Sequence, residues 1–109
     1  MDEKNAIAML GALSQETRLH MIKFLVGRGD AGASAGEIAQ TVGAISSKAS
    51  FHLSALEQAG LISSERKSRN IIYRARLDAL GGLVSFILDD CCAGHPDIRA
   101  CCVPPGSVC

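Results

Sequence analysis

The sequence predicts a mainly α-helical domain that carries one small β-hairpin. Apolar residues recur at helical spacing through most of residues 2–59 and again through 77–91. Between them, residues 61–66 and 71–76 form two short runs rich in residues that favour β-strands. The chain has 109 residues, of which 48% are hydrophobic and 20% charged, a composition typical of one small globular domain. A two-domain enzyme is therefore excluded.

The first two helices follow from apolar spacing. A helix is expected over residues 2–13, where Ile7, Leu10 and Leu13 recur at helical intervals. A second helix is expected to begin at Ser14, a good N-cap residue. Its apolar face is predicted to hold Leu19, Ile22, Leu25 and Val26. Residues 29–33 are rich in glycine and predict a loop.

A third, short helix is expected to open at Ser34. Glu37 stands three residues later, which is the capping-box arrangement. Ile38 and Val42 are expected to face the core, and Gly43 to end the helix.

The fourth helix, Ser46 to Ala59, has the most informative surface. One of its faces must be the core side, because it gathers the apolar residues Ala49, Leu53 and Leu56. The opposite face and its flanks carry small hydroxyls, a lysine and an aromatic ring: Ser47, Lys48, Ser50, Phe51 and Ser54. Hydroxyls reach base edges and phosphates, and an apolar ring can rest on a thymine methyl, so this face suits the major groove of double-stranded DNA. The alternative is an ordinary solvated face with one stray phenylalanine.

Basic charge is concentrated just after this surface. Eleven basic residues balance eleven acidic ones over the chain, yet residues 48–76 hold six basic and two acidic residues. The two β runs are joined by residues 67–70, a hairpin tip that carries Lys67 and Arg69. A helix-turn-helix followed by a basic hairpin is a winged helix, and the hairpin is expected to contact DNA phosphates. The alternative is a surface ribbon whose charges protect an exposed sheet edge.

The last helix, about 77–91, predicts a homodimer. It carries an apolar stripe at heptad-like spacing: Leu77, Leu80, Val84, Ile87 and Leu88. In so small a domain this stripe indicates pairing with a second copy, together with the first helix. The expected interface comprises Ile7, Leu10, Leu80, Val84 and Ile87. The alternative is that the stripe covers only the core of its own chain.

The cysteines are confined to the last 19 residues, at positions Cys91, Cys92, Cys101, Cys102 and Cys109. A secreted disulfide scaffold would spread them through the fold. Neither a targeting peptide nor a membrane-spanning run is recognised, so we expect a cytoplasmic protein with reduced thiols and no membrane partner. Residues 104–106, Pro-Pro-Gly, indicate flexibility. We therefore divide the chain into a winged-helix domain, 1–90, and a flexible cysteine-rich tail, 91–109.

Two adjacent cysteine pairs about ten residues apart can converge on one soft ion. Thiolates select soft, thiophilic centres over hard cations. Neighbouring cysteines rarely form a disulfide with each other, because the small ring strains the peptide between them. The alternative is a set of incidental thiols.

Several motifs together resemble the ArsR/SmtB family of winged-helix repressors. They are ALSQETRL (12–19), EIA (37–39), ASFHL (49–53), AGLI (59–62), and Arg69–Asn70 before Tyr73. The resemblance covers about residues 6–88. It implies a homodimer, paired through its first and last helices, that binds a roughly palindromic operator, represses transcription and dissociates when an inducer binds. Two positions depart from the family pattern: Ile45, where relatives often carry proline, and Ala49, which is smaller than the usual β-branched residue.

Within that family the chain resembles the arsenite-responsive members, whose vicinal cysteines end the last helix. The resemblance implies that Cys91 and Cys92 hold trivalent arsenic, with Cys101 or Cys102 as the third thiolate and Cys109 as the spare. Two alternatives stay open: Cys109 as the third ligand, and a site of only two thiolates. Antimonite or a trivalent methylated arsenical is a further candidate inducer, and no resident cofactor is expected. Residues 34–39 lack the cysteine pair of the family's cadmium sensors, and the zinc-ligand spacing of its last helix is not reproduced.

Three alternatives stay open: a thiol-redox-sensing repressor, a zinc- or cadmium-sensing repressor of the same fold, and a thiol-rich metallochaperone without DNA binding. His20 and His52 each stand alone, so a partly buried structural role or a phosphate contact is expected for them. The sequence offers no catalytic dyad, phosphate loop or nucleophile elbow, so an enzyme is not expected.

Overall fold

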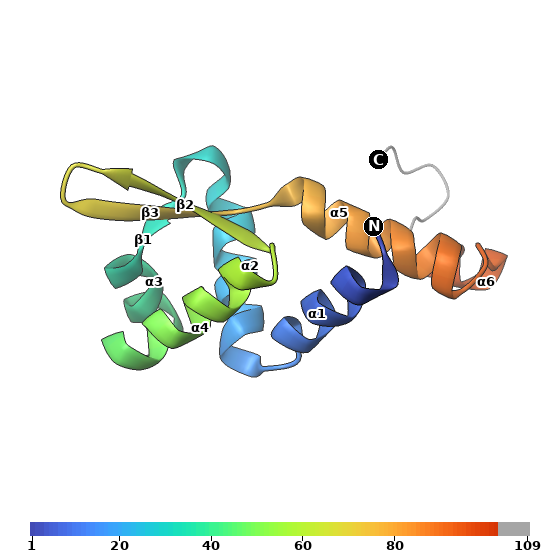
Figure 1. The fold of residues 1–109 in the computed structure, drawn as a ribbon, viewed down its shortest axis with the longest axis horizontal. Coiled ribbons are helices and arrows are strands. Elements are labelled where there is room, and N and C mark those ends of the chain that lie inside the picture. The colour runs from blue at the N-terminus through green and yellow to red at the C-terminus, as the bar shows by residue number, and fades with distance from the viewer. Residues whose placement is uncertain (103–109) are drawn as a thin grey trace.

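A computed structural model describes the backbone of residues 1–102 and the side chains of all of these except Cys91, Cys101 and Cys102. The elements follow in the order α1 (Glu3–Leu13), α2 (Glu16–Arg28), a 3₁₀ turn η1 (Gly29–Ala31), β1 (Ala33–Ser34), α3 (Ala35–Val42), α4 (Ser46–Gln58), β2 (Ile62–Lys67), β3 (Asn70–Ala75), α5 (Leu77–Ser85), a π-helical segment η2 (Phe86–Cys91) and α6 (Pro96–Cys102). This is the predicted winged helix-turn-helix. The β2–β3 hairpin and α6 lie at opposite ends of the long axis (Figure 1). No helix in the described range is long and apolar enough to cross a bilayer.

The third helix has the predicted caps, and the first helix has an N-cap that was not predicted. Asp2 accepts a hydrogen bond from the backbone N–H of Asn5 at 2.7 Å and so begins α1. Ser34 and Glu37 form the predicted capping box. Gly43 ends α3 in the left-handed conformation, with φ at 71°.

The predicted start of the second helix at Ser14 is wrong by one residue. Ser14 instead closes α1, because both its backbone N–H and its hydroxyl donate to the carbonyl of Gly11. The cap of α2 is Gln15, whose side-chain oxygen accepts from the backbone N–H of Arg18 at 2.9 Å.

The sheet has three antiparallel strands in the order β1-β3-β2. Strand β1 joins the end of the expected loop, Ala33, to the expected helix start, Ser34, and its two residues are too few for any alternation to show. Gly32 allows this strand to approach β3. A Cβ at Gly32 would lie 2.5 Å from the carbonyl oxygen of Tyr73, and its φ is +63°, so only glycine fits there.

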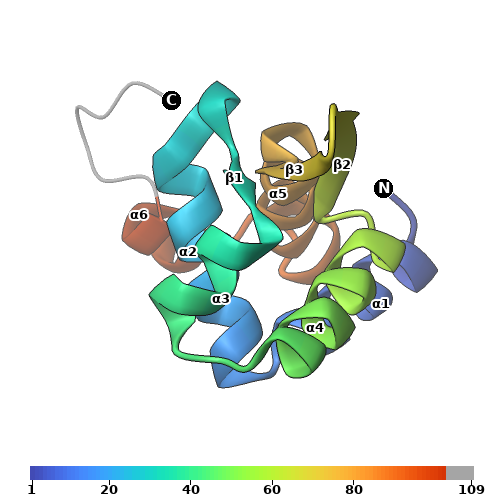
Figure 2. The ribbon, with the colours of Figure 1, turned by 90° about the vertical axis from the view of Figure 1, so that its left-hand side faces the viewer.

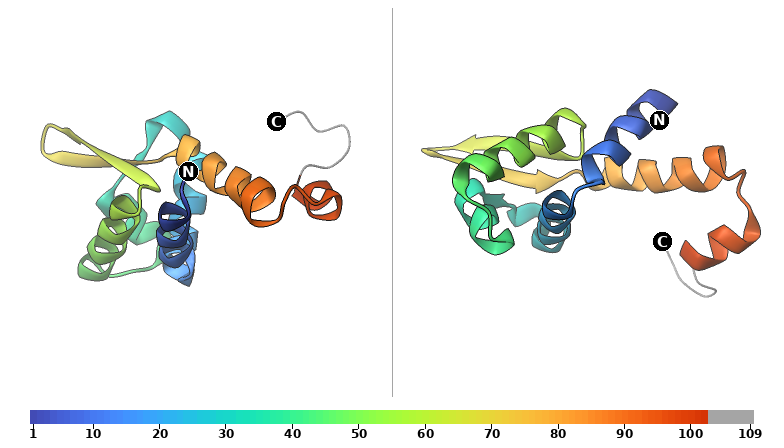
Figure 3. Two further views of the ribbon diagram at one scale, coloured as in Figure 1. Left: turned by 45° about the vertical axis from the view of Figure 1, so that its right-hand side comes forward. Right: turned by 90° about the horizontal axis from the view of Figure 1, so that it is seen from below.

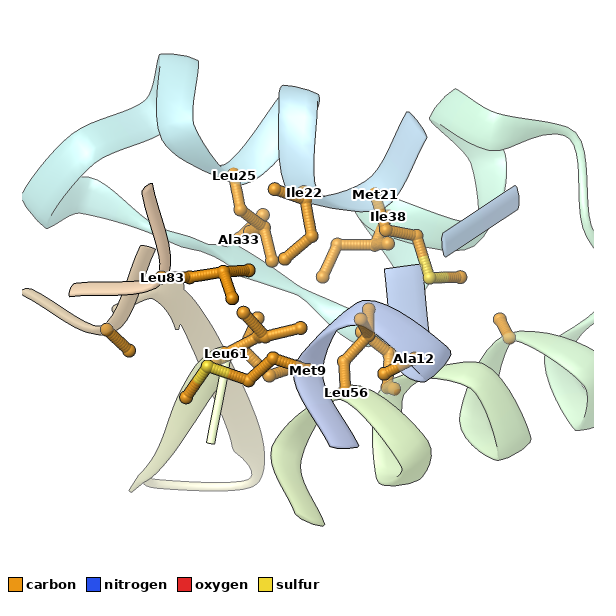
Figure 4. Close-up of a cluster of buried hydrophobic side chains, with 14 of the residues drawn as sticks. Met9, Ala12, Met21, Ile22, Leu25, Ala33, Ile38, Leu56, Leu61 and Leu83 are labelled. Atoms are coloured by element: carbon orange, nitrogen blue, oxygen red, sulfur yellow. The ribbon is translucent and has the colours of Figure 1, made fainter. Parts of the chain in front are cut away.

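The core is formed by residues of α1, α2, α3, α4, α5 and the sheet (Figure 4). The predicted core face of α4 is confirmed, because Ala49, Leu53 and Leu56 are all buried. The predicted face of α2 is wrong at Leu19 and Val26, which are exposed. The buried residues of α2 are Met21, Ile22 and Leu25. Leu19 and Val26 lie roughly a quarter turn to one side of that face.

Residues 96–102 are helical, where a flexible tail was predicted. We expected the second cysteine pair on a loop, but Pro96–Cys102 form helix α6 (Figure 3). Proline suits the first position of a helix, and Asp97 complements the helix dipole in the first turn. The expected flexibility of residues 103–109, including Cys109, concerns positions outside the described residues.

Candidate nucleic-acid interface and cysteine segment

The outward face of α4 presents the five side chains of this helix that the sequence assigned to DNA. Ser47, Lys48, Ser50, Phe51 and Ser54 are all exposed. Phe51 is 65% exposed. Ile45 supplies no side-chain hydrogen bond to the start of α4, so protein side chains leave the N–H groups of its first turn available. Such a helix start attracts phosphate. Figure 2 shows α3 and α4 side by side, as a helix-turn-helix requires.

Arg18 of α2 joins this surface, which sequence reasoning missed. Its Nε donates to Nδ1 of His52 at 3.0 Å, and its guanidinium carbon lies 5.7 Å from the centre of the Phe51 ring. The Phe51 and His52 rings meet edge to face, 5.7 Å apart. His52 is half-buried and bonded to a side chain of the same protein, which matches the structural role predicted for it. His20 is exposed.

The electrostatic environment of His52 favours the neutral form of its imidazole. Burial lowers the pKa of its imidazole, and the positive charges of Arg18 and Lys48 lower that pKa further. A neutral imidazole is also what Arg18 requires, because Nδ1 must be unprotonated to accept a hydrogen bond.

The β2–β3 hairpin turns through Ser68 and Arg69, and Ser68 adopts a left-handed φ of 58°. Glu65 neutralises part of the basic charge there. Its carboxylate lies 3.0 Å from Arg74 and 3.7 Å from Lys67, and the hydrogen bond from Arg74 together with the Lys67 charge lowers the pKa of Glu65. Within residues 1–102, Arg69 forms no ion pair. In the described part of the chain the charge of Arg69 is therefore less compensated than that of Lys67.

A groove connects the hairpin to α4. Its lining residues come from the start of α3, from α4 and from the hairpin: Ser34, Ala35, Gly36, Ser50, Arg69, Asn70, Ile71 and Tyr73. The structure thus brings the predicted DNA residues Ser50 and Arg69 onto one surface, although nineteen positions separate them in the sequence.

An apolar face lies on the other side of the body, across α1 and α5. The inward residues of α5 and η2 are Ala79, Leu83 and Leu88. The predicted interface residues face outward or lie at the edge: Ile7, Leu10 and Val84 are exposed, and Leu80 and Ile87 are half-buried. An open cavity between α1 and η2 is lined by Glu3, Ala6, Ile7, Leu10, Phe86 and Asp90. On the last helix, Leu77 and Val84 of the stripe are therefore left exposed, whereas Leu80 and Ile87 pack against the chain's own core and Leu88 is buried.

The cysteine segment reverses direction after η2. Ala93 and Gly94 both have positive φ, and Arg99 of α6 forms an ion pair with Asp89 of η2. Cys92 lies at the reversal and is half-buried. The side chains of Cys91, Cys101 and Cys102 lie outside the described residues. Among the side chains that are described, no three His, Cys, Asp or Glu residues cluster as metal ligands.

Comparisons with known proteins agree with this architecture. Residues 13–65 match the protein family described as Helix-turn-helix domain. The HTH-type transcriptional regulator YgaV of Escherichia coli is 32% identical over 89 residues, which cover 82% of this chain and 88% of that protein. An ArsR-like transcriptional regulator from Rhodococcus superposes with a TM-score of 0.71 at 27% identity, covering 91% of this chain and 89% of that one.

A second solved structure is the homodimeric winged helix-turn-helix DNA-binding domain Mb0332 from Mycobacterium bovis, described as a possible ArsR-family regulator. It superposes with a TM-score of 0.65 at 26% identity, covering 84% of this chain and 85% of that one.

Proposed function

The chain belongs to the ArsR-like family of winged-helix transcriptional regulators, and on this premise we propose that it is a homodimeric repressor that trivalent arsenic, or antimony, releases from its operator. As a member of this family it is a DNA-binding regulator and not an enzyme. The proposal adds three things to that: the dimer, the inducer and the direction of the response.

DNA recognition is assigned to α4 and the hairpin. Ser47, Ser50, Phe51 and Ser54 would face base edges in the major groove, where hydroxyls and an apolar ring can discriminate bases. Lys48, Lys67 and Arg69 would contact phosphates and fix the register of the protein on the duplex. The groove shared by Ser50 and Arg69 supports the simultaneous use of both elements.

The homodimer is supported by the apolar face of α1 and α5. Ile7 is 61% exposed and Val84 50% exposed, and a cavity lies beside Ile7 and Leu10. A second copy would bury these residues, whereas a monomer leaves them in water. Mb0332, a homodimer at 26% identity, supports the same assembly. Two copies would present two reading helices to half-sites about one DNA turn apart, ~34 Å.

Arsenic binding is assigned to Cys91 and Cys92, with Cys101 or Cys102 as the third thiolate. The observation that carries this assignment is the fold-back of α6 onto η2 through Arg99 and Asp89. It ties the helix that ends in the second cysteine pair to the segment that ends at the first. Several adjacent thiolates favour a soft centre. The π-helical form of η2 is a further support, because such segments recur at functional sites.

Arsenic binding would weaken DNA binding by changing the proposed dimer interface. Asp90 and Phe86 of η2 line the same cavity as Ile7 and Leu10 of α1, and Cys91 follows directly after Asp90. Drawing the cysteines together would therefore shift the elements on which the second copy packs. The inducer must bind the DNA-free state more tightly. A coupling of ~2–3 kcal/mol would weaken operator binding roughly 30- to 150-fold.

The test is release of the protein from DNA taken upstream of its own gene, followed by fluorescence anisotropy in a thiol-free reductant. Wild type should dissociate on addition of arsenite, and the double variant Cys91→Ser, Cys92→Ser should bind DNA normally but stay bound. Cys109→Ser is the matched control and should dissociate like wild type. Continued release of the double variant would refute the site. Release by a mild oxidant but not by arsenite would instead favour the redox sensor, and failure of every form to bind DNA would refute the repressor.

A further inference from the structure

Arg18 occupies the junction between α2 and the recognition helix α4. It lies in the first turn of α2, three residues after the Gln15 cap, and it is half-buried. Its side chain reaches α4, where Nε donates to His52 Nδ1 at 3.0 Å and the guanidinium lies against the Phe51 ring. A planar guanidinium held by one hydrogen bond and one aromatic face has lost much of its rotational freedom before any ligand arrives.

We propose that Arg18 binds a phosphate of the DNA backbone beside the recognition helix, and that His52 and Phe51 hold its guanidinium ready for that contact. Arginine carries five N–H donors, and the bond to His52 uses the single one on Nε. The four N–H groups on the two Nη atoms have no hydrogen-bond acceptor within residues 1–102. These terminal groups are able to bind phosphate as a fork.

Most of the other arginines in the described chain differ from Arg18 in having a carboxylate partner. Four arginines are already neutralised by a carboxylate, in the pairs Arg28–Glu37, Arg74–Glu65, Arg76–Asp78 and Arg99–Asp89. In the described part of the chain, Arg18, Arg66 and Arg69 have no such partner. Arg66 and Arg69 lie on the hairpin, one of the two elements that we assign to DNA. The third uncompensated arginine, Arg18, lies beside the other such element, α4.

The position of Arg18 favours phosphate over bases. Phe51 projects from α4 with most of its surface exposed, and Arg18 stacks against that ring from the neighbouring helix. A side chain that reaches the reading surface from outside the recognition helix approaches the duplex at the flank of the groove, where the backbone runs. Exposed Lys48, on α4 itself, adds to the same positive field.

A purely structural role is the competing explanation, because the same contacts could serve only to join α2 to α4. The salt dependence of DNA binding separates the two. Each phosphate contact contributes about 0.9 to the slope of log affinity against log salt. An arginine that only joins α2 to α4 makes no such contribution to the slope, because it releases no counterions from DNA.

The experiment measures binding to operator DNA and to unrelated duplex DNA between about 50 and 200 mM salt. Arg18→Gln should lower the salt slope by about 0.9 per protomer and weaken binding to both DNAs by the same factor, because phosphate contacts do not depend on sequence. Arg76→Gln is the matched control, since Arg76 is paired with Asp78, and it should change neither quantity. An unchanged slope in Arg18→Gln would overturn the proposal, whether or not affinity falls.

Two further variants test the positioning. His52→Ala removes the acceptor for Arg18 but leaves its charge, so affinity should fall severalfold, whereas His52→Asn offers an amide oxygen in place of Nδ1 and should restore it. Arg18→Lys keeps the charge without the planar fork and should bind both DNAs more weakly with the slope retained. If Arg18→Lys bound DNA with wild-type affinity, a guanidinium held ready by His52 and Phe51 would be contradicted. This test does not depend on whether Arg18→Gln folds.

Discussion

Arg99 of α6 forms an ion pair with Asp89 of η2, ten positions earlier in the chain. Between these two residues the backbone reverses direction at Ala93 and Gly94, both of which have positive φ. The ion pair joins two helical segments, each of which ends in cysteine. The ion pair therefore supports a single thiolate site built from both cysteine pairs. A substitution of Arg99 can break the ion pair without changing a cysteine.

Breaking that ion pair should reduce sensitivity to arsenite. Both partners are about half exposed, so the pair is worth about 0.2–1 kcal/mol. Arg99→Gln should therefore raise the arsenite concentration that releases half of the DNA by up to about fivefold, without changing DNA affinity in the absence of arsenite. Arg28→Gln, which breaks the Arg28–Glu37 pair, is the control and should leave the arsenite response unchanged. An identical response in Arg99→Gln and wild type would show that the fold-back does not assist binding.

The apolar face of α1 and α5 predicts a homodimer that a single charged substitution in this face should disrupt. Val84→Glu places a carboxylate in the proposed interface and should yield a folded monomer that binds the operator at least tenfold more weakly. Val26→Glu is a matched control, because Val26 is 43% exposed against 50% for Val84 but lies on α2, outside the proposed interface. Light scattering measures the mass of each. A Val84→Glu protein that remains dimeric would move the interface elsewhere.

The two predicted hairpin contacts should differ in strength. Lys67 shares Glu65 with Arg74, whereas Arg69 has no carboxylate partner in the described chain. Arg69→Ala should therefore flatten the salt dependence of DNA binding more than Lys67→Ala does. Equal slopes in the two variants would indicate that Glu65 moves away from Lys67 when DNA binds.

The surface of α4 should determine sequence preference. Ser50→Ala and Phe51→Ala should change the ranking of operator variants, because these side chains are assigned to base edges. Neither substitution removes a charge, so the salt slope should stay at its wild-type value. A uniform loss of affinity over all sequences would assign both residues to the DNA backbone instead.

Acidification should destabilise the protein through His52. Burial and the charges of Arg18 and Lys48 lower the pKa of His52 below the usual value of 6.5, so the folded state favours the neutral ring. The unfolded chain binds the proton on His52 more readily than the folded chain does. The stability that results is fully present above the pKa of His52 in the unfolded chain, and it is lost as the pH falls through the lower pKa of the folded state. Between about pH 8 and pH 5, the melting temperature should fall more for wild type than for His52→Asn. Carboxylates with lowered pKa, such as Glu65, act equally in both proteins. Equal falls would show that His52 contributes nothing.

The sequence predicted most where one physical pattern dominated. The core face of α4 follows from the spacing of Ala49, Leu53 and Leu56, and the capping box follows from Ser34 and Glu37. Strand β1 could not be predicted, because its two residues become a strand only by pairing with Tyr73 and Ile72.

The site was predicted least well where its parts come from distant positions. The role of Arg18 depends on His52, 34 positions away, and no local pattern signals that contact. Helix α6 was missed because glycine and proline around it indicated a flexible tail, although Pro96 suits the first turn of a helix. The arsenic ligands remain a prediction from the cysteine pattern and the family resemblance.

The most direct test of the central claim is X-ray absorption of the arsenic-bound protein, which counts the sulfur neighbours of the metalloid. We expect three sulfur neighbours per arsenic in wild type, three also in Cys109→Ser, and loss of the site in the double variant Cys91→Ser, Cys92→Ser. Arsenic surrounded by oxygen in wild type, or by three sulfur atoms in the double variant, would contradict the proposed sensor.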